Sequence, residues 1–218
     1  VSNPPYSIHW EGKNNPLLIN DPRFSPAGLL APPSKADLAF TIHMLSWLST
    51  SGTAAIVELP GVLYRGGAEQ KIREYLIENN YIGAVIQLPP DLFFGTTIAT
   101  CIIVLKKRKK DNKTLFIDAS AEFVRGGNKN KLSDENHQKI LAAFKNRQDS
   151  EYFAKLVDNQ KIGANDYNIA VSSYVVQEDT REVIDITQLN AEISRIAARQ
   201  SELRTAIDVI VTDIEGSS

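Results

Sequence analysis

The stretch TAAIVEL at residues 53–59 is short, apolar and partly β-branched, which is the pattern of a strand buried on both faces of a sheet. Helical patterns with an apolar face lie on either side of it, at residues 34–51, with Ser34 as the predicted N-cap, and at residues 68–80. Further strand-like runs follow at residues 81–88, 98–106 and 114–118. This alternation predicts an α/β fold of the doubly wound kind, with a mostly parallel sheet.

Two of these runs differ from the others because no helix separates them. Pro89 and Pro90 end the strand predicted at residues 81–88, and the next strand begins at Ile98. Such a short connection is typical of antiparallel strands. We therefore expect an antiparallel edge strand in the otherwise parallel sheet.

The composition is that of an ordinary globular chain, with 43% apolar and 23% charged residues in 218. No stretch of about 18 apolar residues predicts a membrane span, and the first residues do not resemble a secretory signal. The single cysteine, Cys101, indicates a reducing cytoplasm without structural disulfides. His9, His43 and His137 lack metal-ligand spacing, so we expect no metal site.

Four residues near the start of the chain, Asn3-Pro4-Pro5-Tyr6, combine groups that suit methyl transfer to an exocyclic amine. The lone pair of such an amine is delocalised into its ring, so an enzyme must orient the nitrogen. An Asn oxygen and an adjacent backbone carbonyl can each accept one amine hydrogen. The prolines stiffen the turn, and the tyrosine ring can stack on an extruded base, which is worth about 1 to 3 kcal/mol. A rigid turn with a packed tyrosine is the alternative interpretation.

A second segment, LPPDLFFGTTIAT at residues 88–100, makes the resemblance to a known family specific. With it, the chain from Asn3 to about Tyr174 resembles the C-terminal part of the methylation (M) subunit of type I restriction-modification systems, a γ-type N6-adenine DNA methyltransferase. Other matching segments follow in the same order: GVLYRGGAE at 61–69, FIDAS at 116–120 and NDYN at 165–168. An ordered series across most of the chain is far more specific than the tetrapeptide alone.

The resemblance implies the second half of a Rossmann-like methyltransferase sheet and transfer of a methyl group from S-adenosylmethionine to adenine N6. Asn3 and the Pro4 carbonyl would grip the target amine, in a catalytic motif that Pro5 and Tyr6 complete. Tyr6 and either Phe93 or Phe94 would stack on the two faces of the base, and Phe93 matches better by spacing.

The family's glycine-rich cofactor loop precedes the tetrapeptide. We therefore expect the cofactor site to lie mostly outside this chain, with Asn3 and Pro4 as its contacts here. We also expect preceding sequence to be missing and the chain alone to be inactive.

The resemblance also implies double-stranded DNA, a specificity (S) subunit, a second M subunit and a restriction (R) subunit as partners, and no membrane. Two other functions stay open. The tetrapeptide can orient an amide or another amine, so the substrate could be a protein glutamine or RNA. Alternatively, the segment could serve chiefly as an interaction module that docks on the S subunit.

A basic run at the end of the strand predicted at residues 98–106 could contact DNA phosphates. It comprises Lys106, Lys107, Arg108, Lys109 and Lys110. A solvated turn is the alternative, because charge runs at turns are commonly exposed. Glu58, at the end of the strand at 53–59, either lines the mouth of the site or faces water, and we expect it to face water.

The last segment predicts one helix with an apolar seam, about 43 Å long at 1.5 Å per residue, with Asp185 and Gln188 as its N-cap pair. We expect it to dock against partner helices, because its seam is too apolar to stand in water; folding back on its own domain is the alternative. The chain thus divides into residues 1–119 (methyltransferase half-domain), 120–184 (mixed α/β extension) and 185–218 (docking helix). The seam residues are Ile186, Leu189, Ile193, Ile196, Leu203, Ile207, Ile210 and Ile214.

Overall fold

The computed structural model describes residues 1–177 and 186–215. The chain forms two units, residues 1–178 and 179–218. The first unit holds a five-stranded sheet with its covering helices. The second holds one long helix, α6 (Ile186–Glu215).

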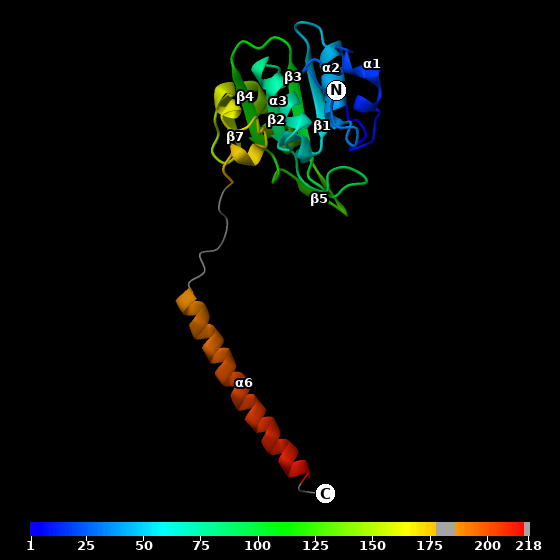
Figure 1. Ribbon diagram of the computed structural model, residues 1–218. Coiled ribbons are helices and arrows are strands. Elements are labelled where there is room, and N and C mark those ends of the chain that lie inside the picture. Colours follow the sequence, from blue (N-terminus) through cyan, green and yellow to red (C-terminus); the bar gives the residue numbers. More distant parts are fainter. Residues whose placement is uncertain (178–185, 216–218) are drawn as a thin grey trace. The chain divides into compact units, whose positions relative to one another are not determined.

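The sheet of the first unit has the strand order β1-β3-β2-β4-β7 (Figure 1). β1, β2 and β4 run in one direction, and β3 and β7 run against them. As a result, β2 and β4 pair in parallel, while β3 is antiparallel to both its neighbours and β7 is antiparallel to β4. The strands are β1 (Thr53–Glu58), β2 (Ile82–Gln87), β3 (Cys101–Lys106), β4 (Lys113–Asp118) and β7 (Ala154–Asp158).

The predicted α/β class is confirmed, as is the antiparallel pairing of β2 with β3. The expected common direction holds for β1, β2 and β4. β3 lies one strand in from the edge rather than at it, and the antiparallel edge strand is β7. Because β3 inserts between β1 and β2, it converts what would be a parallel contact into two antiparallel ones.

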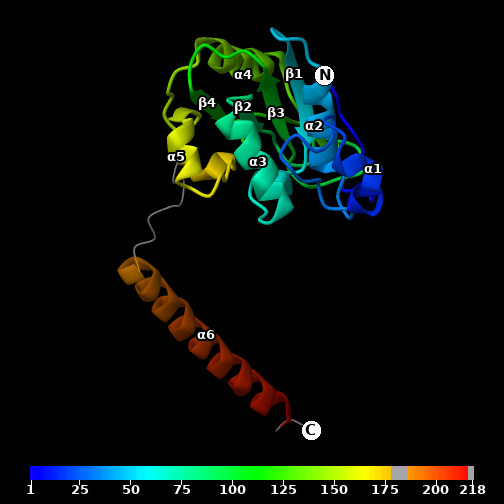
Figure 2. The ribbon, with the colours of Figure 1, turned by 45° about the horizontal axis from the view of Figure 1, so that its top comes forward.

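Helices cover both faces of the sheet (Figure 2). α2 (Asp37–Trp47), α3 (Ala68–Glu78) and α5 (Asn159–Gly163) pack on one face, and α4 (Asp134–Asn146) packs on the other. Burial on both faces explains why the strands are continuous apolar runs. The shorter elements are η1 (Gly12–Asn14), α1 (Pro16–Ile19), η2 (Pro60–Leu63), η3 (Val171–Ser173), β5 (Val124–Gly126) and β6 (Lys129–Lys131).

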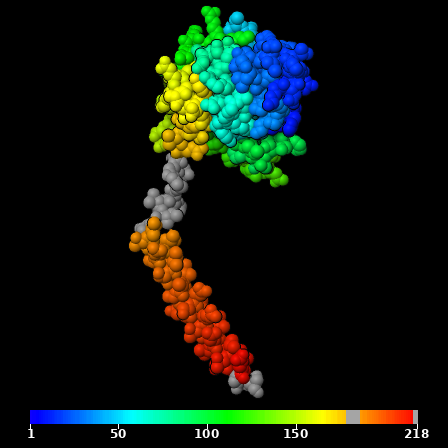
Figure 3. Space-filling view, in the orientation of Figure 1, coloured from blue at the N-terminus to red at the C-terminus, as the bar shows by residue number. Residues whose placement is uncertain are grey.

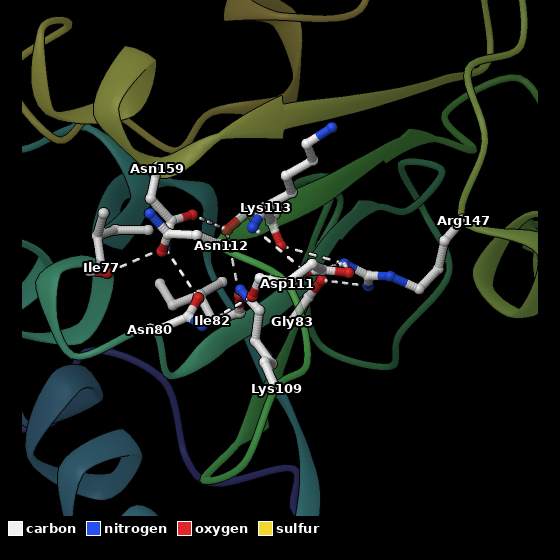
Figure 4. Close-up of polar contacts among 11 residues, drawn as sticks. Ile77, Asn80, Ile82, Gly83, Lys109, Asp111, Asn112, Lys113, Arg147 and Asn159 are labelled. Atoms are coloured by element: carbon white, nitrogen blue, oxygen red, sulfur yellow. Dashed lines mark hydrogen bonds and ion pairs between the residues drawn. The ribbon is translucent and has the colours of Figure 1, made fainter.

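A buried amide ties the elements together at the end of the sheet where β2 and β4 begin (Figure 4). The Asn159 side chain is 5% exposed, and its oxygen accepts a hydrogen bond from Thr114 Oγ1 at 3.0 Å. Its nitrogen donates to the Ile77 carbonyl at 3.1 Å and to the side-chain oxygens of Asn80 and Asn112 at 3.0 and 3.1 Å. This end of the sheet is therefore closed by satisfied polar groups.

The second unit confirms the predicted C-terminal helix. α6 has 30 residues, about 45 Å at 1.5 Å per residue. Its seam side chains are all exposed, from 45% for Leu189 to 70% for Ile186, and Figure 3 shows this helix in orange to red. The predicted cap residue Asp185 lies outside the described residues.

Arg73 on α3 is a buried cation that joins three parts of the first unit. Its side chain is 1% exposed, and its Nε donates to the Tyr167 carbonyl at 2.8 Å while a terminal nitrogen donates to the Val62 carbonyl at 3.0 Å. Burial lowers the pKa of the Arg73 guanidinium to about 10. The group links α3 to η2 and to the segment after α5.

Replacing Arg73 by Met should lower the free energy of unfolding by about 2 to 4 kcal/mol, because two buried carbonyls would lose their donors. Urea unfolding followed by circular dichroism measures this change. Lys71→Met on the same helix is the control, since Lys71 only forms an exposed ion pair with Glu74 and should change stability by less than about 1 kcal/mol. Equal urea midpoints for the two variants would contradict the stabilising role of the buried Arg73 side chain.

Candidate functional site

One row of residues crosses the sheet at the end where β1, β2 and β4 finish. Glu58 pairs with Cys101, Cys101 pairs with Gln87, and Gln87 pairs with Asp118. In open α/β sheets, ligands bind outside the carboxyl ends of the parallel strands. Both segments that the sequence singled out leave the sheet at this row.

The tetrapeptide is held at both of its ends. Before it, the Ser2 amide donates to the Ala55 carbonyl at 2.9 Å and the Val57 amide donates to the Ser2 carbonyl at 3.0 Å, so Ser2 runs parallel to β1. After it, the Ser7 amide donates to Asp37 Oδ1 at 2.8 Å. Ser7 has φ +49°, a conformation that a non-glycine residue adopts at some cost. The Asp37 contact therefore fixes a turn that the chain would not otherwise favour.

Inside the tetrapeptide, the Tyr6 hydroxyl donates to Asn3 Oδ1 at 2.8 Å. Pro4 is buried, whereas Asn3 and Pro5 are exposed. A carboxamide oxygen has two lone pairs, so Asn3 Oδ1 can accept a second hydrogen while Tyr6 holds the amide in place. Burial is the largest cause that raises the pKa of Tyr6, followed by electrostatic interaction with Glu58 and Cys101 when these groups are ionised. The hydroxyl therefore stays a hydrogen-bond donor.

The segment with Phe93 and Phe94 leaves β2 after Gln87 and returns to β3 at Cys101, so it lies at the same end of the sheet as the tetrapeptide. Phe93 is partly buried and packs against the hydrophobic cluster under α4, whereas Phe94 is fully exposed. We refer to residues 89–97 as the aromatic loop. The two rings thus differ in burial, and the stacking of either ring on a base stays a prediction.

Glu58 corrects one expectation. We expected it to face water, but it is 0% exposed, because α2 covers the end of β1: Thr41 on α2 donates its hydroxyl to Glu58 Oε1 at 2.9 Å. Burial raises the pKa of Glu58 to about 8, opposed by the Thr41 hydrogen bond and assisted by the charges of Asp37 and Glu69. At neutral pH this carboxyl therefore keeps its proton.

Three polar atoms near this end are buried without a hydrogen-bond partner in the described part of the chain: Glu58 Oε2, Asp37 Oδ2 and Thr100 Oγ1. Each carries lone pairs that burial makes costly to leave unpaired. Sequence reasoning missed the roles of Asp37 and Glu58. The sequence signal for these roles was weak, because Asp37 resembled a residue of a helix start and Glu58 resembled an ordinary strand end.

The basic run lies at the opposite end of the sheet, because Lys106 pairs with Thr53 at the start of β1. Two of its amino groups are used internally: Lys107 Nζ donates to the Leu48 carbonyl at 2.5 Å, and Lys109 Nζ donates to the Ile82 carbonyl at 2.7 Å (Figure 4). Burial lowers the pKa of Lys109 to about 8. The structure does not bring this run together with the tetrapeptide, and its contact with DNA stays a prediction.

Neither glycine pair of the described chain forms a strand-to-helix cradle for a nucleotide-like cofactor. Gly66 and Gly67 precede α3, but η2 separates them from β1, and Gly127, at φ +67°, forms the turn between β5 and β6. With the glycine pairs ruled out as a cofactor loop, Asn3 and Pro4 are the cofactor contacts that stay predicted in this chain.

Among residues 1–177 and 186–215, no group of three or more His, Cys, Asp or Glu side chains is placed to hold a metal ion. None of the described helices combines the length and apolar character needed to cross a membrane.

Comparison with known proteins shows the family to which the chain is related. Residues 1–183 match the family described as N-6 DNA Methylase. The chain is 50% identical over 216 residues to the type I restriction enzyme MpnII methylase subunit of Mycoplasma pneumoniae, covering 99% of this chain and 40% of that protein. It is 33% identical to the MjaVII methylase subunit of Methanocaldococcus jannaschii, covering 99% of this chain and 38% of that one.

A solved structure shows the same relation. The methyltransferase subunit of a type I restriction-modification system from Streptococcus thermophilus matches with a TM-score of 0.77 and 46% identity, over 79% of this chain and 37% of that one. The chain thus spans about two fifths of the length of these relatives.

Glu58→Gln should change how stability depends on pH, because glutamine keeps the shape of the protonated carboxyl but cannot ionise. The folded-state pKa of about 8 lies above the ordinary value of 4.5, so the folded protein binds the proton more tightly. The stability that this proton contributes is complete below 4.5 and is lost as pH rises toward 8. Relative to the variant, the wild type should lose up to about 1.4 kcal/mol per pH unit across this window.

Urea unfolding at several pH values between these two limits measures the difference. Glu135→Gln, an exposed position on α4, is the control and should follow the wild type. A Glu58→Gln profile parallel to the wild-type profile would contradict the buried, protonated carboxyl.

Proposed function

The chain belongs to the N-6 DNA methylase family, and we propose that the intact protein transfers a methyl group from S-adenosylmethionine to the N6 amine of adenine in double-stranded DNA. Similarity to methylase subunits of type I restriction enzymes, one of them 50% identical, supports this proposal. The structural observation that carries it is the strand register, which brings the tetrapeptide and the aromatic loop to one end of the sheet.

In this proposal, Asn3 and Pro4 orient the target amine. Asn3 Oδ1 and the Pro4 carbonyl each accept one hydrogen of the amine, which turns the nitrogen lone pair toward the methyl donor. The hydrogen bond from Tyr6 to Asn3 keeps the carboxamide oriented before the substrate arrives, so less freedom is lost on binding. Pro5 stiffens the turn because its φ is fixed.

The adenine must leave the duplex to reach this site, since its amine is otherwise paired and stacked. Tyr6 and one ring of the aromatic loop would hold the extruded base between them. Phe94 is the exposed ring, and Phe93 is partly buried against the cluster under α4. We assign Tyr6, Phe93 and Phe94 to base stacking, with Phe93 in contact after a small movement of the loop.

S-adenosylmethionine supplies the methyl group when it is bound. The residues described here form only part of a site for it, with Asn3 and Pro4 as the nearest contacts. We therefore propose that the remaining contacts come from outside residues 1–218 and that this chain alone is inactive.

We also propose that the intact protein works with a specificity subunit, a second methylase subunit and a restriction subunit, and that α6 is a docking element. The seam of α6 is continuous and exposed within its own unit. Arg195, Arg199 and Arg204 line the same face as Ile196, Leu203 and Ile207. A partner helix with an apolar stripe and acidic margins would match this face. The proposal also keeps the division of the chain into a methyltransferase half-domain (1–119), a mixed α/β extension (120–184) and a docking helix (185–218).

Asn3→Ala in the full-length protein should lower the methylation rate on the order of 100-fold, because the amine would lose one of its two acceptors. Tyr6→Phe keeps the ring but removes the hydrogen bond to Asn3, and should lower the rate less than Tyr6→Ala, which also removes stacking of about 1 to 3 kcal/mol. The assay follows radiolabelled methyl transfer to duplex DNA, and mass spectrometry identifies the methylated base.

The same assay on RNA and on protein extracts tests the alternative substrates. Labelling of a glutamine or of RNA with no labelling of DNA would refute the assignment. Full activity of the Asn3→Ala variant on DNA would refute the role of the tetrapeptide.

Charges placed in the seam of α6 should prevent assembly. Ile196→Glu with Leu203→Glu puts two carboxylates into the seam, while Ala198→Glu with Thr205→Glu puts the same charges on the opposite face of the helix. Co-purification of the full-length protein with its specificity subunit should fail for the first pair and succeed for the second. Equal assembly of both variants would contradict docking through the seam.

A further inference from the structure

The β5–β6 hairpin (β5 in Figure 1) contacts the aromatic loop and lies at the end of the sheet where β4 finishes. β4 finishes at Asp118 in the row that also contains Glu58 and Gln87, and the hairpin follows a few residues later. β5 and β6 pair antiparallel in a separate two-stranded sheet. The hairpin is therefore an appendage placed where the proposed substrate would approach.

The hairpin holds the aromatic loop directly. Asn130 is 4% exposed, and its amide donates to the Asp91 carbonyl at 3.0 Å while its side chain donates to the Pro90 carbonyl at 2.9 Å. On the other side of Phe93 and Phe94, Lys129 Nζ donates to the Thr96 carbonyl at 2.9 Å. These bonds fix the aromatic loop on both sides of the two rings, so the position of the rings depends on the hairpin.

The same hairpin carries cationic side chains, two of which contact Asp91 or Thr96 of the aromatic loop, which also contains the exposed Phe94. The Arg125 and Lys129 side chains are 59% and 37% exposed, and Lys131 is exposed. The stem of Lys131 crosses the space beside Gly126, where a Cβ would lie 2.9 Å from Lys131 Cδ. Because Gly126 pairs with Lys129, the two lysines lie close together on one face of the hairpin. Arg125 pairs with Asn130 and so belongs to the other face, but its guanidinium and Lys129 Nζ both reach the Asp91 carboxylate.

Among the described residues, the acidic side chain that lies nearest this group is Asp91. Its carboxylate oxygens lie 3.7 Å from Arg125 and 3.5 Å from Lys129, which leaves an excess of positive charge. Exposed ion pairs at such distances are weak. Arg125 also donates to Asn130 Oδ1 at 3.0 Å, and Lys129 to the Thr96 carbonyl. A guanidinium carries five N–H groups and an ammonium three, so each cation can bind a further anion while it keeps these bonds. Glu122, which is also near the hairpin, already pairs with Lys139.

From this geometry we propose that Arg125, Lys129 and Lys131 bind the DNA phosphates that flank the extruded adenine, so that the β5–β6 hairpin couples backbone contact to placement of the aromatic loop. This inference rests on the proposed function. A guanidinium can bind phosphate through two hydrogen bonds, and ammonium groups act as point charges. The hairpin differs in position from the basic run at Lys106–Lys110, which lies at the far end of β3.

The test compares the salt dependence of DNA binding by the full-length protein. The variant Arg125→Gln with Lys131→Gln removes two cations and keeps Lys129, which bonds the Thr96 carbonyl. It also alters the bond from Arg125 to Asn130 Oδ1, so its control is the variant Arg125→Lys with Lys131→Arg, which alters the same bond and keeps both charges. Fluorescence anisotropy with a fluorescein-labelled duplex of mixed sequence gives the binding constant over a NaCl series. The slope of log K against log salt should fall in magnitude by about 2, and affinity at moderate salt should fall about tenfold or more.

Two further variants separate charge location from charge number and from folding. Lys145→Gln with Lys161→Gln removes two exposed cations from α4 and α5. The slope of log K against log salt should then change by well below 2, because these cations lie outside the hairpin. Arg125→Lys with Lys131→Arg keeps both charges and should keep the slope. Thermal unfolding checks that all variants are folded.

The outcomes distinguish this inference from the proposed function. If the wild type binds and methylates DNA but the Arg125→Gln, Lys131→Gln variant keeps its slope and affinity, the hairpin inference is wrong and the proposed function stands. The hairpin inference is also wrong if Arg108→Gln with Lys110→Gln causes the larger loss. If the wild type neither binds nor methylates DNA, the proposed function itself fails.

Discussion

The register of β3 between β1 and β2 is the constraint on which the rest of the site depends. It aligns Glu58, Cys101 and Gln87 in one row, so the chain leaves and re-enters the sheet at the same level on neighbouring strands. A shift by one residue would turn every side chain of β3 to the other face of the sheet. The tetrapeptide follows Ser2, which is bonded to β1, and the aromatic loop joins β2 to β3. The observed register brings both segments to the same end of the sheet.

Buried carboxyl groups connect this register to the tetrapeptide. Asp37 receives the amide of Ser7, and Thr41, one turn later on α2, donates to Glu58 at the end of β1. α2 thus contacts both the turn after Tyr6 and the strand beside Ser2. Such burial of polar groups costs stability unless they are paired, and one oxygen of each carboxyl group has no partner among the described residues. The unpaired oxygens of Asp37 and Glu58 therefore reduce stability next to the turn that follows the tetrapeptide.

The sequence allowed the strands β1 to β4 and α6 to be predicted, and it singled out the tetrapeptide and the aromatic loop, because each is a contiguous pattern. The strands β5, β6 and β7 were not predicted. Glu58 was misjudged because its burial depends on α2, which is remote in sequence and covers the end of β1 through Thr41. The expected cap Ser34 was also wrong, since α2 begins at Asp37 with Ala36 as its N-cap and no side-chain cap. The contacts of Asn130 with Pro90 and Asp91 could not be anticipated, because they join segments about 40 residues apart in sequence without a recognisable pattern.

Our central proposal is that one base is held between the tetrapeptide and the aromatic loop, at the end of the sheet where β1 and β2 finish. An experimental structure of the full-length protein with its partners on substrate DNA tests it most directly. We predict an extruded adenine with its N6 within hydrogen-bond distance of Asn3 Oδ1 and its ring between Tyr6 and Phe93 or Phe94. An extruded base bound elsewhere, or a substrate strand running over the opposite end of the sheet beside Lys106–Lys110, would contradict it.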